Sequence, residues 1–238
     1  MSALAALRCA SHRLLFGLTA LAFALIAVWD ASGLDLALAR LAGDTGGFSG
    51  RDNRAVILSL HEVPRFMSMI GVVTLLVAVR WPFGVLHRLD LRERLRLAMS
   101  VLAALVAVSL LKNTSRTSCP WDLAEFGGVA HYVSHWDWRL GDGGPGRCFP
   151  AGHASAAFAY LAGWFALRRV APRAARVWLI AAAACGLVLG LAQQWRGAHY
   201  MSHTLWTAWV CWSVALAIDV VCRRTHDARN ARVLKPKQ

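Results

Sequence analysis

Histidines and cations gather in three short stretches of an otherwise apolar sequence. His153 follows Pro150 and Gly152, and His199 and His203 lie four residues apart further along the chain. One imidazole can act as a nucleophile, while a second acts as the general acid for a leaving oxygen. This pairing suits the transfer of a phosphoryl group.

The residues around these histidines also suit a phosphate. Lys112 and Arg196 supply positive charge. Pro150 and Gly152 are expected to leave free backbone N–H groups at a helix N-terminus, which is a natural anion site. Cations and N–H dipoles of this kind stabilise phosphate oxygens on which charge develops. We therefore predict phosphate binding by Lys112, Arg196 and Gly152.

The composition of the rest of the chain indicates a membrane protein that holds these residues in place. Hydrophobic residues make up 57% of the sequence and charged residues 16%, against about half and a quarter in soluble domains. The apolar residues fall into blocks of roughly 15 to 25, the length that crosses a bilayer. We expect an all-α, polytopic membrane protein forming one domain over residues 1–238. Its six transmembrane helices are predicted at about 14–29, 55–79, 97–111, 154–167, 177–192 and 204–221.

The positive charges predict the orientation. Most of the 26 Lys and Arg residues lie before the first block, in the second and fourth connections, and in the tail 222–238. Basic loops mark the cytoplasmic side. We therefore expect a bacterial inner-membrane protein with both termini and the tail in the cytoplasm and the histidines at the periplasmic face. The net charge of +13 does not indicate nucleic-acid binding, because no soluble surface is left to read bases.

A large periplasmic loop is expected between Lys112 and Pro150. It is long and glycine-rich, and connections of this kind are usually functional or disordered. It contains Cys119 and Cys148, which would lie in an oxidising compartment. A disulfide between them would close a loop of about 30 residues, worth roughly 3 kcal/mol.

Polar residues interrupt the second apolar block. His61, Glu62 and Arg65 would be costly at membrane depth unless they face a polar cavity. Pro64 would kink the helix there. The alternative is that this stretch lies at the wet interface.

The three polar stretches resemble the motifs of the type 2 phosphatidic acid phosphatase / haloperoxidase superfamily, whose six-helix membrane enzymes remove phosphate from lipids. The family motifs are Lys-x6-Arg-Pro, Pro-Ser-Gly-His and Ser-Arg-x5-His-x3-Asp. The residues that match are Lys112 and Pro120 in the first, Pro150, Gly152 and His153 in the second, and Gly197 and His199 in the third.

The resemblance implies a role for each matching residue. His199 would take the phosphoryl group, His153 would protonate the leaving lipid alcohol, and Lys112 would bind phosphate oxygen. No metal or other cofactor is implied, and the partners would be a membrane lipid phosphate and the bilayer.

The chain departs from the motifs at several positions. Cys119 and Gln193 replace arginines, Ala151 and Ala192 replace serines, and His203 replaces the aspartate.

We expect other residues to compensate for these departures. If the chain from Gln193 to His199 is helical, Arg196 lies one turn beyond Gln193 and can reach the same phosphate. Arg116 and Arg147 are candidates for the second arginine. His203, one turn after His199, would hydrogen-bond its imidazole and complete the catalytic set.

The sequence therefore predicts removal of phosphate from a lipid phosphate or pyrophosphate through phospho-His199. One alternative is a catalytically inactive protein that binds a lipid phosphate or assists a partner, as the missing arginines and aspartate suggest. Another is a histidine-ligated metal or haem protein, because His199 and His203 have the i, i+4 spacing that suits one metal. Lys112 and Arg196 would repel a cation, which favours the phosphatase.

Overall fold

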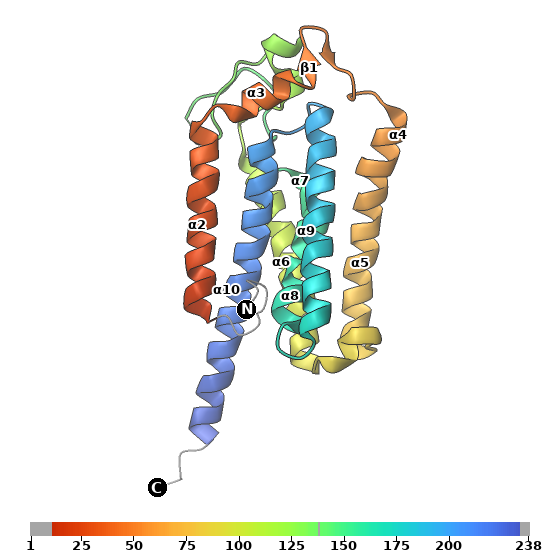
Figure 1. Cartoon of the computed structure of the whole chain (residues 1–238), viewed down its shortest axis with the longest axis vertical. Coiled ribbons are helices and arrows are strands. Elements are labelled where there is room, and N and C mark those ends of the chain that lie inside the picture. The colour runs from red at the N-terminus through yellow and green to blue at the C-terminus, as the bar shows by residue number, and fades with distance from the viewer. Residues whose placement is uncertain (1–10, 138, 234–238) are drawn as a thin grey trace.

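A bundle of upright helices forms the body of the protein (Figure 1). The computed structural model describes residues 11–137 and 139–233, and side chains as far as Arg223. In that part of the chain, five helical segments are long and apolar enough to cross a membrane. They are α2 (His12–Ala31), α4 to α5 (Arg54–Ile57 and Val63–Arg80, joined by a π-helix at Leu58–Glu62), α6 (Leu91–Thr114), α9 (Pro172–Trp195) and the first part of α10 (Met201–Val233). The protein is therefore membrane-embedded and of the all-α class.

The block predicted at 154–167 differs from the others. It forms α7 (Gly152–Phe158), the 3₁₀ turn η6 (Ala159–Leu161) and α8 (Ala162–Leu167), and α8 is entirely buried. The close approach of α7 to α9 needs a small residue, since a Cβ at Gly186 of α9 would lie 2.4 Å from the Phe158 ring of α7. Protein surrounds α8, so the length of this segment need not match the thickness of the bilayer. A sixth span therefore stays a prediction.

The observed helices extend beyond the predicted apolar blocks. The third block was expected at 97–111, whereas α6 begins at Leu91, with Asp90 as its N-cap. The tail expected from residue 222 continues α10 to Val233, and residues 1–10 and 234–238 lie outside the described residues. Charged residues are good helix formers, so a helix does not end where its apolar stretch ends.

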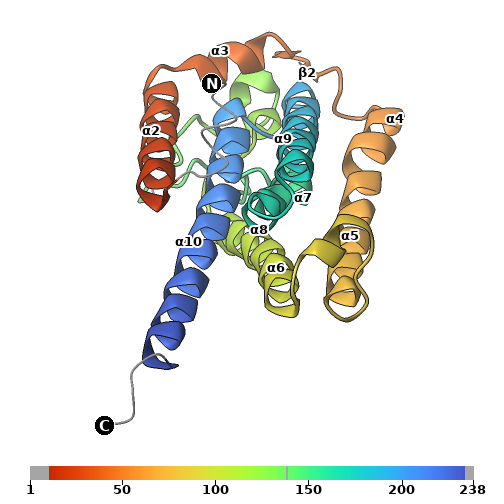
Figure 2. The ribbon, with the colours of Figure 1, turned by 60° about the horizontal axis from the view of Figure 1, so that its bottom comes forward.

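A layer of short elements covers one end of the bundle. It contains α3 (Leu34–Arg40), the two-stranded ribbon β1 (Gly43–Asp44) and β2 (Gly47–Phe48), and the 3₁₀ turns η4 (Pro120–Asp122) and η5 (Ala124–Phe126). Phe48 and Phe126 pack at 4.8 Å between ring centroids in its small core. Figures 1 and 2 show α3 crossing over the bundle at this end. The layer encloses the polar helix ends beneath it.

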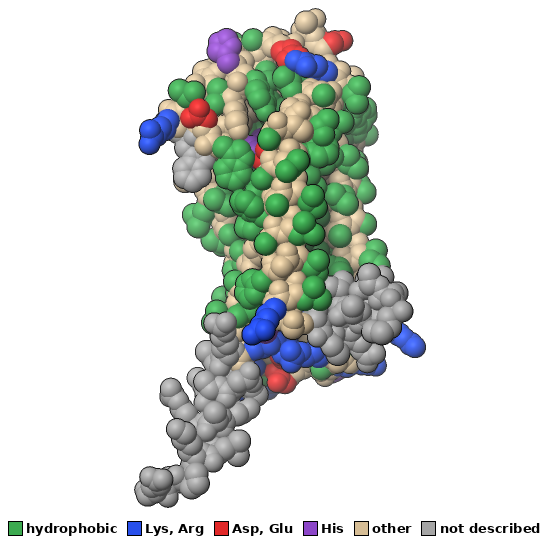
Figure 3. Space-filling view, turned by 60° about the vertical axis from the view of Figure 1, so that its left-hand side comes forward, with side chains coloured by type: hydrophobic (Ala, Val, Ile, Leu, Met, Phe, Trp, Pro, Cys, Tyr) green, Lys and Arg blue, Asp and Glu red, His purple; other side chains and the backbone are tan. Residues whose placement is uncertain are grey.

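Arginines gather at the opposite end, where η3 (Gly84–Arg88) joins α5 to α6. Asp219 of α10 is 1% exposed in its side chain and pairs with Arg96, Arg168 and Arg223 at 2.9 to 3.0 Å. Figure 3 shows Lys and Arg side chains at this lower end and a mostly hydrophobic surface above them. One side of the bundle is therefore strongly basic, as the charge pattern predicted.

Candidate active site

The end of α6 is attached to the segment before α7. The N–H of Arg147 donates to the Ser115 carbonyl and the N–H of Cys148 to the Thr117 carbonyl, both at 2.9 Å. These bonds join segments about thirty residues apart in the chain. As a result, the last turn of α6 lies beside the first turn of α7.

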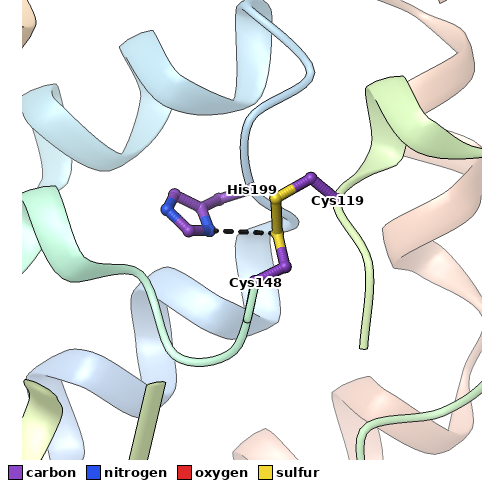
Figure 4. Close-up of side chains that lie close together, drawn as sticks. All are labelled: Cys119, Cys148 and His199. Carbon is purple, nitrogen blue, oxygen red and sulfur yellow. Dashed lines mark hydrogen bonds between the residues drawn. A yellow bond between two sulfur atoms is a disulfide. The ribbon is translucent and has the colours of Figure 1, made fainter. Parts of the chain in front are cut away.

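A disulfide strengthens this attachment. Cys119 and Cys148 are joined, with their Cα atoms 5.1 Å apart. Figure 4 shows the Cys148 sulfur facing the imidazole of His199, and its Sγ lies 3.5 Å from Nδ1. The two sulfurs are bonded to each other, so neither offers a thiolate to a metal here. The disulfide instead forms one wall of the site.

Lys112 crosses the start of α7. A Cβ on Gly152 would lie 3.4 Å from the Lys112 Cδ, so glycine leaves the lysine stem close to the backbone. No carboxylate pairs with Lys112 in the part of the chain that the structure describes. Its ammonium is therefore available to a ligand next to His153.

A turn between α9 and α10 places His199. The N–H of Gly197 donates to the Gln194 carbonyl and the N–H of Ala198 to the Gln193 carbonyl, which is a Schellman motif. Gly197 has φ +72°, and a Cβ there would lie 2.3 Å from the Phe48 ring. The chain is thus not helical all the way from Gln193 to His199, because α9 ends at Trp195.

His203 does not orient His199 as expected. It lies in the first turn of α10, where its Nδ1 donates to the Cys148 carbonyl at 3.1 Å. The two rings meet edge to face, with centroids 5.9 Å apart. Since His199 precedes α10, the i, i+4 helical geometry that suggested a metal pair is absent as well. His203 instead packs beside the nucleophile candidate.

Arg196 bonds to Gln193, the residue that stands where the family motif has arginine. Its Nη1 donates to the Gln193 Oε1 at 3.0 Å, its Nη2 donates to the Arg51 carbonyl at 3.2 Å, and the guanidinium lies over the Trp121 ring. Burial lowers the pKa of Arg196 from its ordinary value. This arginine is held in place by three neighbours at the rim of the histidine cluster.

Arg116 and Arg147 are not brought into the cluster. Both are exposed, and among the described residues neither side chain forms a hydrogen bond or ion pair with a histidine. Arg65 lies close enough for its charge to act on His153, and Arg51 lies 5.2 Å over Trp121, the ring that Arg196 also covers. Arg51 precedes α4 and Arg65 lies in the first turn of α5, a stretch whose role the motif comparison could not suggest.

His61 joins the site from the same segment. Its ring lies against that of His153, with centroids 3.8 Å apart, and its Nδ1 is 2.8 Å from the Glu62 carboxylate. The π-helix at Leu58–Glu62 leaves the Leu60 carbonyl to accept from Gln193. Such π-bulges are frequent at functional sites. The interrupted apolar block therefore faces a polar cluster. The polar residues within that block were the feature of the sequence that pointed to His61.

The environment of His199 keeps its imidazole neutral. His199 is 2% exposed. Burial, and then the charges of Lys112, His203 and His153, hold the pKa of His199 well below its ordinary value near 6.5. The ring of His153 lies 6.3 Å away, and its buried Nδ1 has no hydrogen-bond partner among the described residues. A neutral imidazole beside an unpaired ammonium and an unsatisfied imidazole nitrogen is suited to an anionic ligand.

The fold and the site together define a helical membrane protein with a cluster of histidines and cations at one end of its bundle. The model of the PAP2 superfamily matches residues 94–226, more than half of the chain. The chain therefore belongs to the PAP2 superfamily, the type 2 phosphatidic acid phosphatases, as its motifs indicated. No curated protein and no solved structure matches it. Membership indicates a phosphatase-type enzyme.

The disulfide can be tested by thiol counting and stability. Reduction of the unfolded protein should expose two further maleimide-reactive thiols. The Cys119→Ser/Cys148→Ser variant should lose roughly 3 kcal/mol of stability, because the unfolded chain gains freedom. Thermal unfolding in detergent measures this loss, and Cys185→Ser, which removes an exposed free thiol, is the control. An unchanged thiol count after reduction would contradict the cross-link.

Proposed function

We propose that this protein removes phosphate from a membrane lipid phosphate or pyrophosphate through a phosphohistidine at His199. The observation that carries the proposal is the neutral, buried imidazole of His199, which lies within reach of the charges of Lys112 and His153 at the end of a membrane bundle. Membership of the PAP2 superfamily supports the reaction class.

The proposed reaction has two displacement steps. The lone pair on the His199 Nε2 attacks phosphorus, the bond from phosphorus to the lipid oxygen breaks, and His153 gives that oxygen a proton. Water then attacks the phosphohistidine, releases inorganic phosphate and returns a proton to His153. Lys112 would stabilise the phosphate oxygens throughout. A phosphate dianion next to His153 favours its protonated form, as the first step requires.

The wall of the site supports this choice of nitrogen. A disulfide sulfur has no proton, so its contact with the His199 Nδ1 is favourable when Nδ1 carries the hydrogen. The Nε2 lone pair is then free. In this chain the sulfur stands in for the family carboxylate as the neighbour of Nδ1, although it supplies no charge.

An apolar groove supports a lipid substrate. It has a volume of about 950 Å³ and runs between α5 and α9, beginning at Leu60, next to His61. Its other lining residues include Pro64, Met67, Val188 and Leu189. A lipid chain lying there would enter sideways from the bilayer and place its head group at the histidines. The basic opposite end supports a periplasmic site in a bacterial inner membrane.

A second candidate function rests on one observation. The family arginine positions hold Cys119 and Gln193, and in the described structure no carboxylate bonds to His199. Such a site could bind a lipid phosphate without hydrolysing it. Measurement of phosphate release distinguishes hydrolysis of the lipid phosphate from binding alone.

Phosphate release tests the proposed reaction. Detergent-purified protein should release phosphate from lipid phosphates or pyrophosphates in the presence of EDTA. His199→Ala should abolish release, and His153→Ala should lower it by about 10²- to 10⁴-fold, as expected for loss of a general acid. His131→Ala removes an exposed histidine and should keep full activity. Binding of lipid without release would favour the second function, and release lost to EDTA alone would favour a metal mechanism.

The pH profile tests the state of His199. Because the neutral His199 imidazole attacks and its pKa is lowered, the acid limb of kcat/KM should lie well below pH 6.5. Burial lowers the pKa of His153 to about 3, so less of this general acid carries its proton as pH rises, and kcat/KM should decline from that limb towards alkaline pH. Lys112→Gln removes a charge that lowers the pKa of His199, so its acid limb should move to higher pH, whereas Lys112→Arg should leave it in place. The profile is corrected for the measured ionisation of the substrate. An acid limb of the wild-type profile with its midpoint at or above pH 6.5 would contradict the proposal.

The groove makes a separate prediction. Met67→Trp fills it and should lower kcat/KM for a long-chain lipid phosphate by at least about tenfold, because chain binding no longer contributes to transition-state stabilisation. A water-soluble short-chain phosphate should be hydrolysed as before. Met69→Trp changes an exposed methionine of α5 outside the groove and is the control. Equal effects of both variants would mean that the lipid's hydrocarbon chain binds outside this groove.

A further inference from the structure

A second pocket lies at the end of the bundle opposite the histidine site. It has a volume of about 840 Å³ and is bounded by η3, the end of α8 and the start of α9. Arg88, Arg168, Arg173 and Arg176 line it together with Trp164, and its lining contains no Asp or Glu. Figure 2 shows this end of the bundle, with α8 between α6 and α9. Four positive charges around one cavity favour an anion there as their counter-charge.

Arg168 is the buried member of this set. Its side chain is 2% exposed, and its guanidinium lies 4.9 Å over the Trp164 ring. Nη2 donates to Asp219 at 2.9 Å, whereas Nε and Nη1 are buried with no hydrogen-bond partner in the described part of the chain. Burying such N–H groups unpaired is costly. An oxygen-rich ligand in the pocket would satisfy them.

Asp219 cannot neutralise this region. The same carboxylate accepts from Arg96 and Arg223, and it also lies 3.1 Å from the Nε2 of His12. Glu93 also pairs with Arg96, so two carboxylates face these three guanidinium groups. Positive charge remains in excess beside the pocket, before Arg173 and Arg176 are counted.

The start of α9 adds to the pull on an anion. The helix is 24 residues long, and its N-cap, Ala171, has no side chain that could accept from the first turn. Pro172 at the first position lacks an N–H, and Arg173 and Ala174 follow it in the pocket lining. A helix N-terminus carries a partial positive charge and free N–H donors. Both features favour an anion here.

We propose that this pocket binds the phosphate of an anionic phospholipid. Guanidinium groups bind phosphate oxygens in pairs, and basic pockets between membrane helices recognise acidic head groups. The half-buried Val85 in the pocket lining supplies an apolar contact for the lipid next to its phosphate. A free phosphate ion would use the same donors but would not make this apolar contact. The site is independent of the proposed hydrolysis.

Thermal unfolding of the purified full chain tests the proposal. In zwitterionic detergent, short-chain phosphatidylglycerol should raise the Tm by about 4 °C or more. Phosphatidylcholine of the same chain length should not raise it, and inorganic phosphate should raise it less. Arg173→Gln/Arg176→Gln should weaken the apparent lipid affinity at least about tenfold. Arg169→Gln is the matched control, because it removes an exposed arginine of the same connection that does not line the pocket.

Each outcome decides the assignment. Lys112→Gln, which disables the histidine site, should keep the full lipid effect, and an effect lost in this variant would place the lipid at the histidines instead. Equal stabilisation by inorganic phosphate and phosphatidylglycerol would assign the pocket to free phosphate and overturn the lipid. No stabilisation of the wild type by phosphatidylglycerol, or equal losses in Arg169→Gln and the double variant, would overturn the pocket altogether. None of these readouts depends on turnover, so failure of the proposed function would be seen separately.

Discussion

Cys148 makes the contacts on which the candidate active site depends. Its sulfur is bonded to Cys119 and lies against the His199 Nδ1, its carbonyl accepts from His203, and its N–H donates to Thr117. A single residue thus connects the chain after α6, the turn before α10 and the first turn of α10.

The departures from the family motifs form a consistent set when the contacts are considered. Gln193, at a position where the family has arginine, accepts from Arg196 and donates to the Leu60 carbonyl. Cys119, at the other arginine position, forms the disulfide. Positive charge then comes from Arg196, Arg51 and Arg65 around the rim. The site therefore stays cationic, although its arginines come from positions other than those of the motif arginines.

The two ends of the bundle carry positive charge for different reasons. At the histidine end the cations surround a site with an unsatisfied buried imidazole, and apolar residues lead from it into the groove. At the other end, arginines crowd around Asp219 and continue into a pocket with no acidic lining. Excess charge of one sign in a low-dielectric region is unfavourable unless counter-charge is supplied. Both ends are therefore suited to anionic groups.

The sequence by itself determined the helical class, the apolar segments, the basic end and the family, because hydropathy and motif spacing are local properties of the chain. It also singled out Lys112, His153 and His199, which the fold does gather at one end, and the cysteine pair, which the structure contains. Only the tertiary structure decided that His61 stacks on His153, that Arg116 and Arg147 stay outside, and that His203 bonds to the Cys148 carbonyl. The turn at Gly197 depends on Phe48, about 150 residues earlier, so no local pattern reveals that His199 precedes its helix. Contacts between distant segments depend on how the helices pack, and that information is spread over the whole chain.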